Sequence, residues 1–125
     1  MSSDPRIQRS KSGSGRAAED FVAQHLLSNG YRILERNCVM SRLGELDIVA
    51  SKDGVICFVE VRSRRTSRLG APAETVGARK QRKLRTLASL FLARRGLENP
   101  ARFDVASVVW NGDTPILDYI EDAFV

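Results

Sequence analysis

Two long segments of the chain carry apolar residues three or four positions apart, which is the spacing of an amphipathic helix. The first segment runs from about Gly15 to Asn29, with Ser14 as the expected N-cap and Gly30 as the stop signal. The second runs from about Thr75 to Arg95, and its arginines recur on the arc opposite its apolar residues. The pattern predicts two helices, each with one face for packing.

Five shorter segments have the alternating or continuous apolar patterns of strands. They cover residues 31–37, 44–51, 55–64, 101–110 and about 116–120. The third is apolar at nearly every position before Glu60, which is typical of a strand covered on both faces. Turn sequences at 51–54 and at Asn111-Gly112 separate neighbouring strands. The order α, β, β, β, α, β, β predicts a mixed α/β sandwich in which helices flank a sheet.

The chain has 125 residues, enough for one domain with its own core. We expect residues 1–13 to form a disordered tail, because they are polar, and residues 14–125 to form a single folded domain. No apolar run reaches the roughly 20 residues that cross a bilayer, and the N-terminus lacks the apolar core of a signal peptide. The expected location is therefore the cytoplasm, with no membrane partner.

Basic residues are concentrated in one part of the chain. Residues 62–95 hold 11 arginines and lysines against one acid, Glu74, a net charge of +10 within a chain whose net charge is +5. Positive charge confined to one region suits binding of a polyanion such as nucleic acid through its phosphates. A solvated helix face explains a charge run equally well, so the charge alone leaves both interpretations open.

Cysteine and histidine give no sign of a metal site. Cys38 and Cys57 are 19 residues apart, without a CxxC pattern or clustered histidines. Cys57 shares strand parity with apolar neighbours, so we expect it to be a small buried hydrophobe. The single histidine, His25, falls inside the first predicted helix, where packing is the simpler role.

Carboxylates interrupt two of the predicted strands. Asp47 stands between two apolar residues, and Glu60 follows an apolar run, with Arg62 two positions later on the same face of the strand. Adjacent strands of a hairpin can bring Asp47 and Glu60 close enough to share a cation, and their oxygens favour Mg²⁺ or Mn²⁺. The alternative is a pair of buried salt bridges to nearby arginines.

Glu19 is a candidate third carboxylate for the same site. It shares the side of the first predicted helix that carries Val22 and Leu26. The alternative is an acid in the first turn that stabilises the helix dipole, and the spacing alone favours this second interpretation.

Four separated blocks, GELDIVA, FVEVRSR, GAPAETVGARKQRKLR and RFDVASV, closely resemble the YraN-like uncharacterised protein family 0102. The resemblance extends from about Gly15 to the C-terminal AFV. That family is similar in turn to the PD-(D/E)xK nuclease superfamily, which includes Holliday junction resolvases and restriction endonucleases. The resemblance implies a restriction-endonuclease-like αβββαβ core, with a mixed central sheet flanked by helices, and a Mg- or Mn-dependent endonuclease.

The resemblance also implies roles for individual residues. Asp47 and Glu60 match the two metal-binding carboxylates, and Glu19 matches the helical glutamate of the resolvase-like branch. Gln81 matches a polar position near the site. With Arg62, these residues form the implied catalytic set. In such enzymes a metal ion activates a water and stabilises the charge that develops on the scissile phosphate.

The chain departs from the superfamily at Arg62, where most relatives carry a lysine. Arginine keeps its proton, so it neutralises phosphate charge but cannot act as a base. Lys80 falls on the apolar side of the second predicted helix, and we hypothesise that its amine points toward the carboxylates and supplies the missing group. The alternative is a stem that snorkels along the core edge. An amine well over about 10 Å from both carboxylates would exclude the hypothesis.

Basic side chains near this site would grip phosphates without sequence preference. They are Arg64, Arg65, Arg68, Arg79, Lys80, Arg82, Lys83 and Arg85. Three functions remain open: a metal-dependent nuclease that recognises DNA backbone or structure, a nucleic-acid-binding module with weak or no cleavage because of Arg62, and a protein-interaction domain for an acidic partner. A homodimer is compatible with the sequence.

Overall fold

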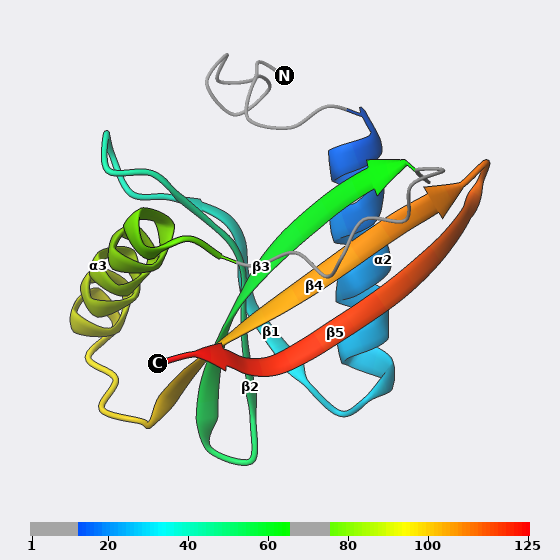
Figure 1. The fold of residues 1–125 in the computed structure, drawn as a ribbon. Helices are drawn as coiled ribbons and strands as arrows, with labels where there is room; N and C mark the ends of the chain where they lie inside the picture. Colours follow the sequence, from blue (N-terminus) through cyan, green and yellow to red (C-terminus); the bar gives the residue numbers. More distant parts are fainter. Residues whose placement is uncertain (1–12, 66–75) are drawn as a thin grey trace, which may run out of the picture.

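Helices and strands follow one another in the predicted order in the computed structural model, which describes residues 13–65 and 76–125 (Figure 1). The elements are α2 (Gly13–Ser28), β1 (Arg32–Val39), β2 (Glu45–Lys52), β3 (Val55–Arg65), α3 (Ala78–Arg95), β4 (Ala101–Asn111) and β5 (Thr114–Phe124). Most of the predicted N-terminal tail, the loop before the second helix and Arg68 lie outside the described residues.

The strands form one five-stranded sheet in the order β1-β2-β3-β4-β5. β3 and β4 are parallel, and the other neighbouring pairs are antiparallel. A parallel pair needs a crossover connection, and α3 lies in that connection. The expected mixed α/β class is therefore confirmed, in line with a restriction-endonuclease-like core.

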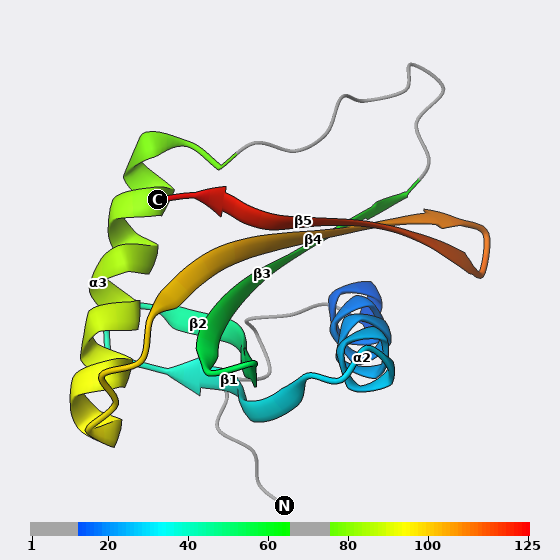
Figure 2. The same ribbon diagram turned by 90° about the horizontal axis from the view of Figure 1, so that it is seen from below.

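The two helices cover opposite faces of the sheet (Figure 2). Phe58 of β3 packs in one apolar cluster with Leu84 and Phe91 of α3. Its neighbours Cys57 and Val59 pack in a second cluster with residues of α2. Because successive strand residues alternate between faces, Glu60 and Arg62 share the α3 face with Phe58. Of the two helices, α3 is therefore the one that can contribute side chains near Glu60.

The central strand, β3, is buried as predicted. Residues Ile56 to Glu60 are all buried, since helices pack on both sides of β3. Cys57 is fully buried, as expected of a small hydrophobe, and both cysteines are free. Among the described residues, neither helix has an apolar stretch of the length and character needed to cross a membrane.

Some predicted boundaries were wrong. α2 begins at Gly13, so Ser14 lies inside the helix and is not its N-cap. α3 begins at Ala78, not Thr75, because Gly77 has an extended backbone and ends the preceding segment. The turn between β4 and β5 consists of Gly112 and Asp113, one position later than expected.

The last strand is longer than the predicted 116–120. β5 extends to Phe124, whose ring stacks on Phe103 of β4 with 4.8 Å between the centroids. An irregularity in the register interrupts the pairing near Val105, and Asp122 has a positive φ of 52° there. The end of this segment is acidic, so the sequence did not indicate that the strand continues there. The strand forms because it pairs with β4, and not because of its own apolar pattern.

A buried carboxylate stabilises this irregular stretch. Asp104 of β4 is fully buried and accepts hydrogen bonds from Arg102 Nε at 3.0 and 3.2 Å, from the Tyr119 hydroxyl at 2.6 Å and from the Asp122 main-chain N–H at 2.9 Å. Arg102 also donates to the Tyr31 hydroxyl at 2.6 Å. Burial raises the pKa of Tyr119, and the hydrogen bond to Asp104 raises it further. The network joins β4, β5 and the start of β1.

Replacing Asp104 with asparagine should destabilise the fold. An amide presents two donors to neighbours that are themselves donors, and it leaves the Arg102 charge without its buried partner. We expect a loss of about 3 kcal/mol in the free energy of unfolding, measured by urea denaturation. Asp118→Asn, an exposed acid on β5, is the matched control and should change it by less than about 0.5 kcal/mol. Equal stabilities of the two variants would contradict the assigned role of Asp104.

Candidate functional site

Asp47 and Glu60 face each other where β2 and β3 separate. The last paired residues of these antiparallel strands are Ile48 and Val59, so the next step along the ladder sets Asp47 opposite Glu60. There the Asp47 carboxylate, through Oδ2, accepts the main-chain N–H of Val61 at 2.9 Å. The Asp47 side chain thus accepts the main-chain N–H that a backbone carbonyl would otherwise accept. This hydrogen bond ties the Asp47 carboxylate to the main chain of β3 just beyond Glu60.

Glu60 is a buried acid in a mixed electrostatic environment. Only 9% of the Glu60 surface is exposed. Burial raises the pKa of Glu60, and the nearby negative charge of Asp47 raises it further, whereas Lys80 and Arg62 act to lower it. The net shift is upward. Loss of hydration is the largest cause, so burial disfavours the charged form of Glu60 even with two cations nearby.

Lys80 comes from α3 to the carboxylate pair. Its Nζ lies 3.5 Å from Glu60 Oε2, and Arg62 Nε lies 3.6 Å from the same oxygen. The first distance is well inside the limit of about 10 Å set above, so the hypothesised direction of the Lys80 amine is confirmed. The Lys80 side chain is 40% exposed, so the side chain is in contact with solvent as well as with Glu60. A lysine from the helix thus lies beside the carboxylate of Glu60.

Gln81 lies beside this group without extending toward it. Its side-chain amide donates to the main-chain oxygen of Val76 at 2.7 Å, and its main-chain N–H bonds to Gly77 at 2.9 Å. These bonds hold the segment that leads into α3. Gln81 therefore fixes where the helix begins and, through it, where Lys80 starts.

Glu19 does not join the carboxylate pair, which corrects the expectation of a three-carboxylate pocket. It is fully buried on α2, and its Oε1 accepts hydrogen bonds from Arg36 at 2.9 Å and from Asn37 at 2.8 Å. In residues 13–65 and 76–125, no group of three or more acidic, thiol or imidazole side chains is arranged to hold a metal ion. The reason is that α2 packs on the sheet face opposite Glu60, where Arg36 of β1 neutralises Glu19.

The predicted phosphate-binding residues lie in two groups. Arg64 and Arg65 end β3 and, by strand alternation, point to opposite faces. The α3 group is exposed, apart from the half-buried Lys80, and consists of Arg79, Lys80, Arg82, Lys83 and Arg85. Arg85 donates to the Val125 main-chain oxygen at 2.7 Å, so it also anchors β5.

Sequence reasoning missed Gly44, which opens the GELDIVA block. Gly44 has a φ of +142°, and a Cβ there would lie 2.7 Å from Lys83 Cε and 3.4 Å from Leu87. The β1–β2 turn therefore lies against side chains of α3, and its positive φ favours glycine at this position. The available signal was a glycine directly before the strand that carries Asp47.

The carboxylate pair fits a hard divalent ion. Mg²⁺ commonly uses one or two protein carboxylates and keeps several waters, and Mn²⁺ accepts similar ligands. Asp47 and Glu60 provide two such ligands, and a bound cation would oppose the upward pKa shift that burial and Asp47 give Glu60. The described residues thus suit an ion that retains much of its water.

Comparison with known proteins places the chain in a family. The profile of the uncharacterised protein family UPF0102 matches residues 18–108. The chain belongs to this family. It is 53% identical to a UPF0102 protein of Symbiobacterium thermophilum over 95 residues, which is 75% of this chain and 80% of that protein. It is 43% identical to a UPF0102 protein of Alkaliphilus metalliredigens over 111 residues, which is 88% of this chain and 96% of that protein.

A third UPF0102 protein, from Stutzerimonas stutzeri, is 44% identical over 113 residues, 89% of this chain and 93% of that protein. The part of the chain that matches the UPF0102 profile contains Asp47, Glu60, Lys80 and Asp104. The candidate site therefore lies inside the UPF0102 domain.

The raised pKa of Glu60 predicts how stability depends on pH without added metal. Because the folded pKa lies above the ordinary value of 4.5, the folded protein binds this proton more tightly than the unfolded chain. The Glu60 contribution to the free energy of unfolding should therefore fall as the pH rises between these two pKa values. Glu60→Gln lacks this titration, so its stability relative to wild type should increase across that window. Urea unfolding from pH 4 to 8 in EDTA measures this, and a constant difference would be evidence against the assignment.

Proposed function

We propose that this protein is a metal-dependent nuclease that hydrolyses phosphodiester bonds of DNA and recognises backbone or structure. The observation that carries the proposal is the convergence of two carboxylates and an amine from three elements. Asp47 of β2 lies opposite Glu60 of β3, and Lys80 of α3 places its amine 3.5 Å from Glu60. Carboxylates with a nearby amine are the functional groups of the PD-(D/E)xK site that the sequence resembles.

Each residue has a definite task in this proposal. Asp47 and Glu60 would hold Mg²⁺ or Mn²⁺, which when bound acidifies a water and stabilises charge on the scissile phosphate. The Val61 N–H keeps the Asp47 carboxylate oriented. The Lys80 amine would hold the attacking water by a hydrogen bond, and the Arg62 guanidinium would bind a phosphate oxygen. Lys80 thus takes the part that Arg62 cannot.

The exposed basic residues support recognition of the DNA backbone. Arg79, Arg82 and Lys83 are exposed on the helix that brings Lys80 to the site. Contacts of this kind neutralise phosphates and carry no sequence information. Recognition would therefore depend on salt concentration and on the shape of the nucleic acid.

Cleavage should depend on Asp47, Glu60 and Lys80, whereas ion binding should depend on the two carboxylates. In Mn²⁺ the wild-type protein should cut at least one of single-stranded, duplex, flapped or four-way DNA, measured by gel assay. Glu60→Gln and Asp47→Asn should abolish cleavage and the thermal stabilisation by Mn²⁺. Lys80→Met should lower the cleavage rate about 100-fold while leaving that stabilisation in place.

Lys83→Met is the matched control for Lys80, because it removes an amine from the same helix at an exposed position. It should weaken DNA binding slightly and leave the rate at saturating DNA unchanged. Equal rates for Lys80→Met and Lys83→Met would remove Lys80 from the proposed mechanism. Absence of cleavage on all four DNA structures would refute the nuclease proposal.

A second function is favoured by one observation on Arg62. Its guanidinium lies 3.6 Å from Glu60, on the oxygen that Lys80 also approaches. Two cations at one carboxylate compete with a divalent ion for it. In this second proposal the protein is a nucleic-acid-binding module of nuclease-like fold with weak or no cleavage.

Arg62→Lys separates the two functions. If Arg62 hinders the metal, the variant should cleave about 10-fold or more faster than wild type in Mn²⁺, because a lysine can move its amine away from Glu60. If Lys80 already supplies the amine, the rate should change less than about threefold. DNA affinity measured at several salt concentrations should fall steeply with salt in both proteins. No DNA affinity even at low salt would contradict both functions.

A further inference from the structure

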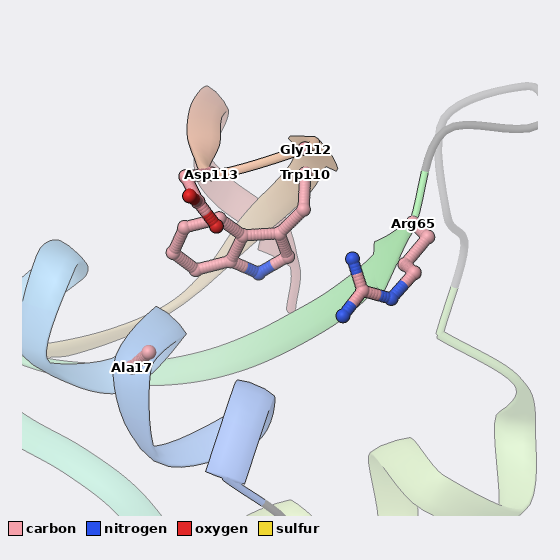
Figure 3. A pocket seen from close by; sticks show the side chains of 5 residues that line it. All are labelled: Ala17, Arg65, Trp110, Gly112 and Asp113. Atoms are coloured by element: carbon pink, nitrogen blue, oxygen red, sulfur yellow. The ribbon is translucent and has the colours of Figure 1, made fainter.

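A second place on the molecule has the chemistry of a nucleobase site. A pocket of about 210 Å³ lies where β3 and β4 end, next to the first turns of α2 (Figure 3). The described residues that line it are Ala17, Arg65, Trp110, Gly112 and Asp113. Its volume is below the roughly 300–1,000 Å³ of sites for drug-sized ligands, so it suits a single ring system.

The indole of Trp110 is held in a defined orientation. Its Nε1 donates a hydrogen bond to Ser63 Oγ at 3.0 Å, which joins the ends of two neighbouring strands. The residue is partly exposed and lines the pocket. An aromatic ring fixed in this way is a stacking surface for an unpaired base, since every base has a π-face.

Arg65 and Asp113 supply charge on two sides of that ring. Arg65 is exposed and pairs in register with Trp110 across β3 and β4, and in Figure 3 its guanidinium extends toward the pocket. Asp113 lies in the turn that follows β4, on the far side of the indole from Arg65 (Figure 3). The guanidinium binds a phosphate, and the carboxylate accepts hydrogen bonds from exocyclic amino groups of a base. A phosphate would be repelled on the Asp113 side, so the two charges orient the nucleotide.

The pocket lies at the end of the strand that carries Glu60. Arg65 is five residues beyond Glu60, about 17 Å at the rise of an extended strand and about five steps of B-form DNA. Arg62 and Arg64 lie between them on the α3 face, and Arg65 turns to the α2 face. A basic path therefore leads from the carboxylate pair around the end of β3 to the indole.

We propose that this pocket binds one unpaired nucleobase of a single-stranded segment, stacked on Trp110, with its phosphate on Arg65 and its edge toward Asp113. The inference rests on the proposed function in that the protein is taken to bind nucleic acid. It adds a preference for DNA with an unpaired segment, because paired bases offer no free face. Stacking here requires neither a metal ion nor cleavage.

Trp110 is the single tryptophan of the chain, so tryptophan fluorescence, excited selectively over the two tyrosines, reports on this pocket. In EDTA, a 15-residue oligodeoxycytidylate should quench the emission of the wild-type protein to saturation. A duplex of the same length should bind with much less quenching. Free deoxycytidine monophosphate should quench only at far higher concentration, and equal affinity for it would overturn the assignment to a strand.

Variants are compared by anisotropy of a labelled oligonucleotide. Trp110→Leu should weaken single-strand binding about 10-fold, whereas Trp110→Phe retains a stacking ring and should stay within about threefold of wild type. Arg65→Gln should weaken binding more than Arg32→Gln, which removes an exposed arginine from the distant edge strand β1. Equal affinities for the Leu and Phe variants, with folding verified by circular dichroism, would overturn the proposal.

The outcomes also separate this inference from the nuclease proposal. Quenching that depends on the single strand, without cleavage in Mn²⁺, would support the pocket and refute the nuclease. Cleavage without quenching would refute the pocket and leave the nuclease in place.

Discussion

The repulsion between two carboxylates at the end of the β2–β3 ladder is the constraint on which the candidate site depends. The antiparallel pairing stops at Ile48 and Val59, and Asp47 then lies opposite a buried Glu60. Asp47 accepts a hydrogen bond from the Val61 main chain, and Glu60 is buried in the central strand. Lys80 of α3 brings positive charge to within 3.5 Å of Glu60, which offsets part of this repulsion.

The two buried acids of the sheet show how differently a carboxylate can be accommodated. Asp104 has donors at 2.6 to 3.2 Å from three residues, which is the arrangement of a structural group with its hydrogen bonds satisfied. The cations of Lys80 and Arg62 lie 3.5 and 3.6 Å from Glu60, and burial together with Asp47 raises the pKa of Glu60. The close contacts of Asp104 hold β5 in place, whereas the longer contacts of Glu60 allow another cation to replace Lys80 or Arg62. This contrast separates the structural cluster from the candidate site.

Much of the site could be predicted from the chain alone because strand alternation is a local property. The parity of Glu60 and Arg62, and the opposition of Asp47 in a hairpin, follow from a period of two and a short turn. The apolar arc of α3 likewise predicted the buried Leu84, Leu87, Ala88 and Phe91. Lys80 stood out for the same reason, as a charged residue on the apolar side of a periodic helix. The resemblance to a family of proteins added the expectation of a nuclease-like core, and the observed sheet agrees with it.

The sequence by itself determined the order of helices and strands, the buried faces and the two carboxylates on one face, since these depend on residue spacing. It could not determine which helix covers which face of the sheet, because helix phase does not encode the path of the chain between elements. For that reason Glu19, well placed on its helix, lies with Arg36 on the side opposite Glu60. The same holds for Trp110 and Arg65, which become neighbours only through the parallel register of β3 and β4. Contacts between residues far apart in the chain are decided by packing, and packing exists only in the tertiary structure.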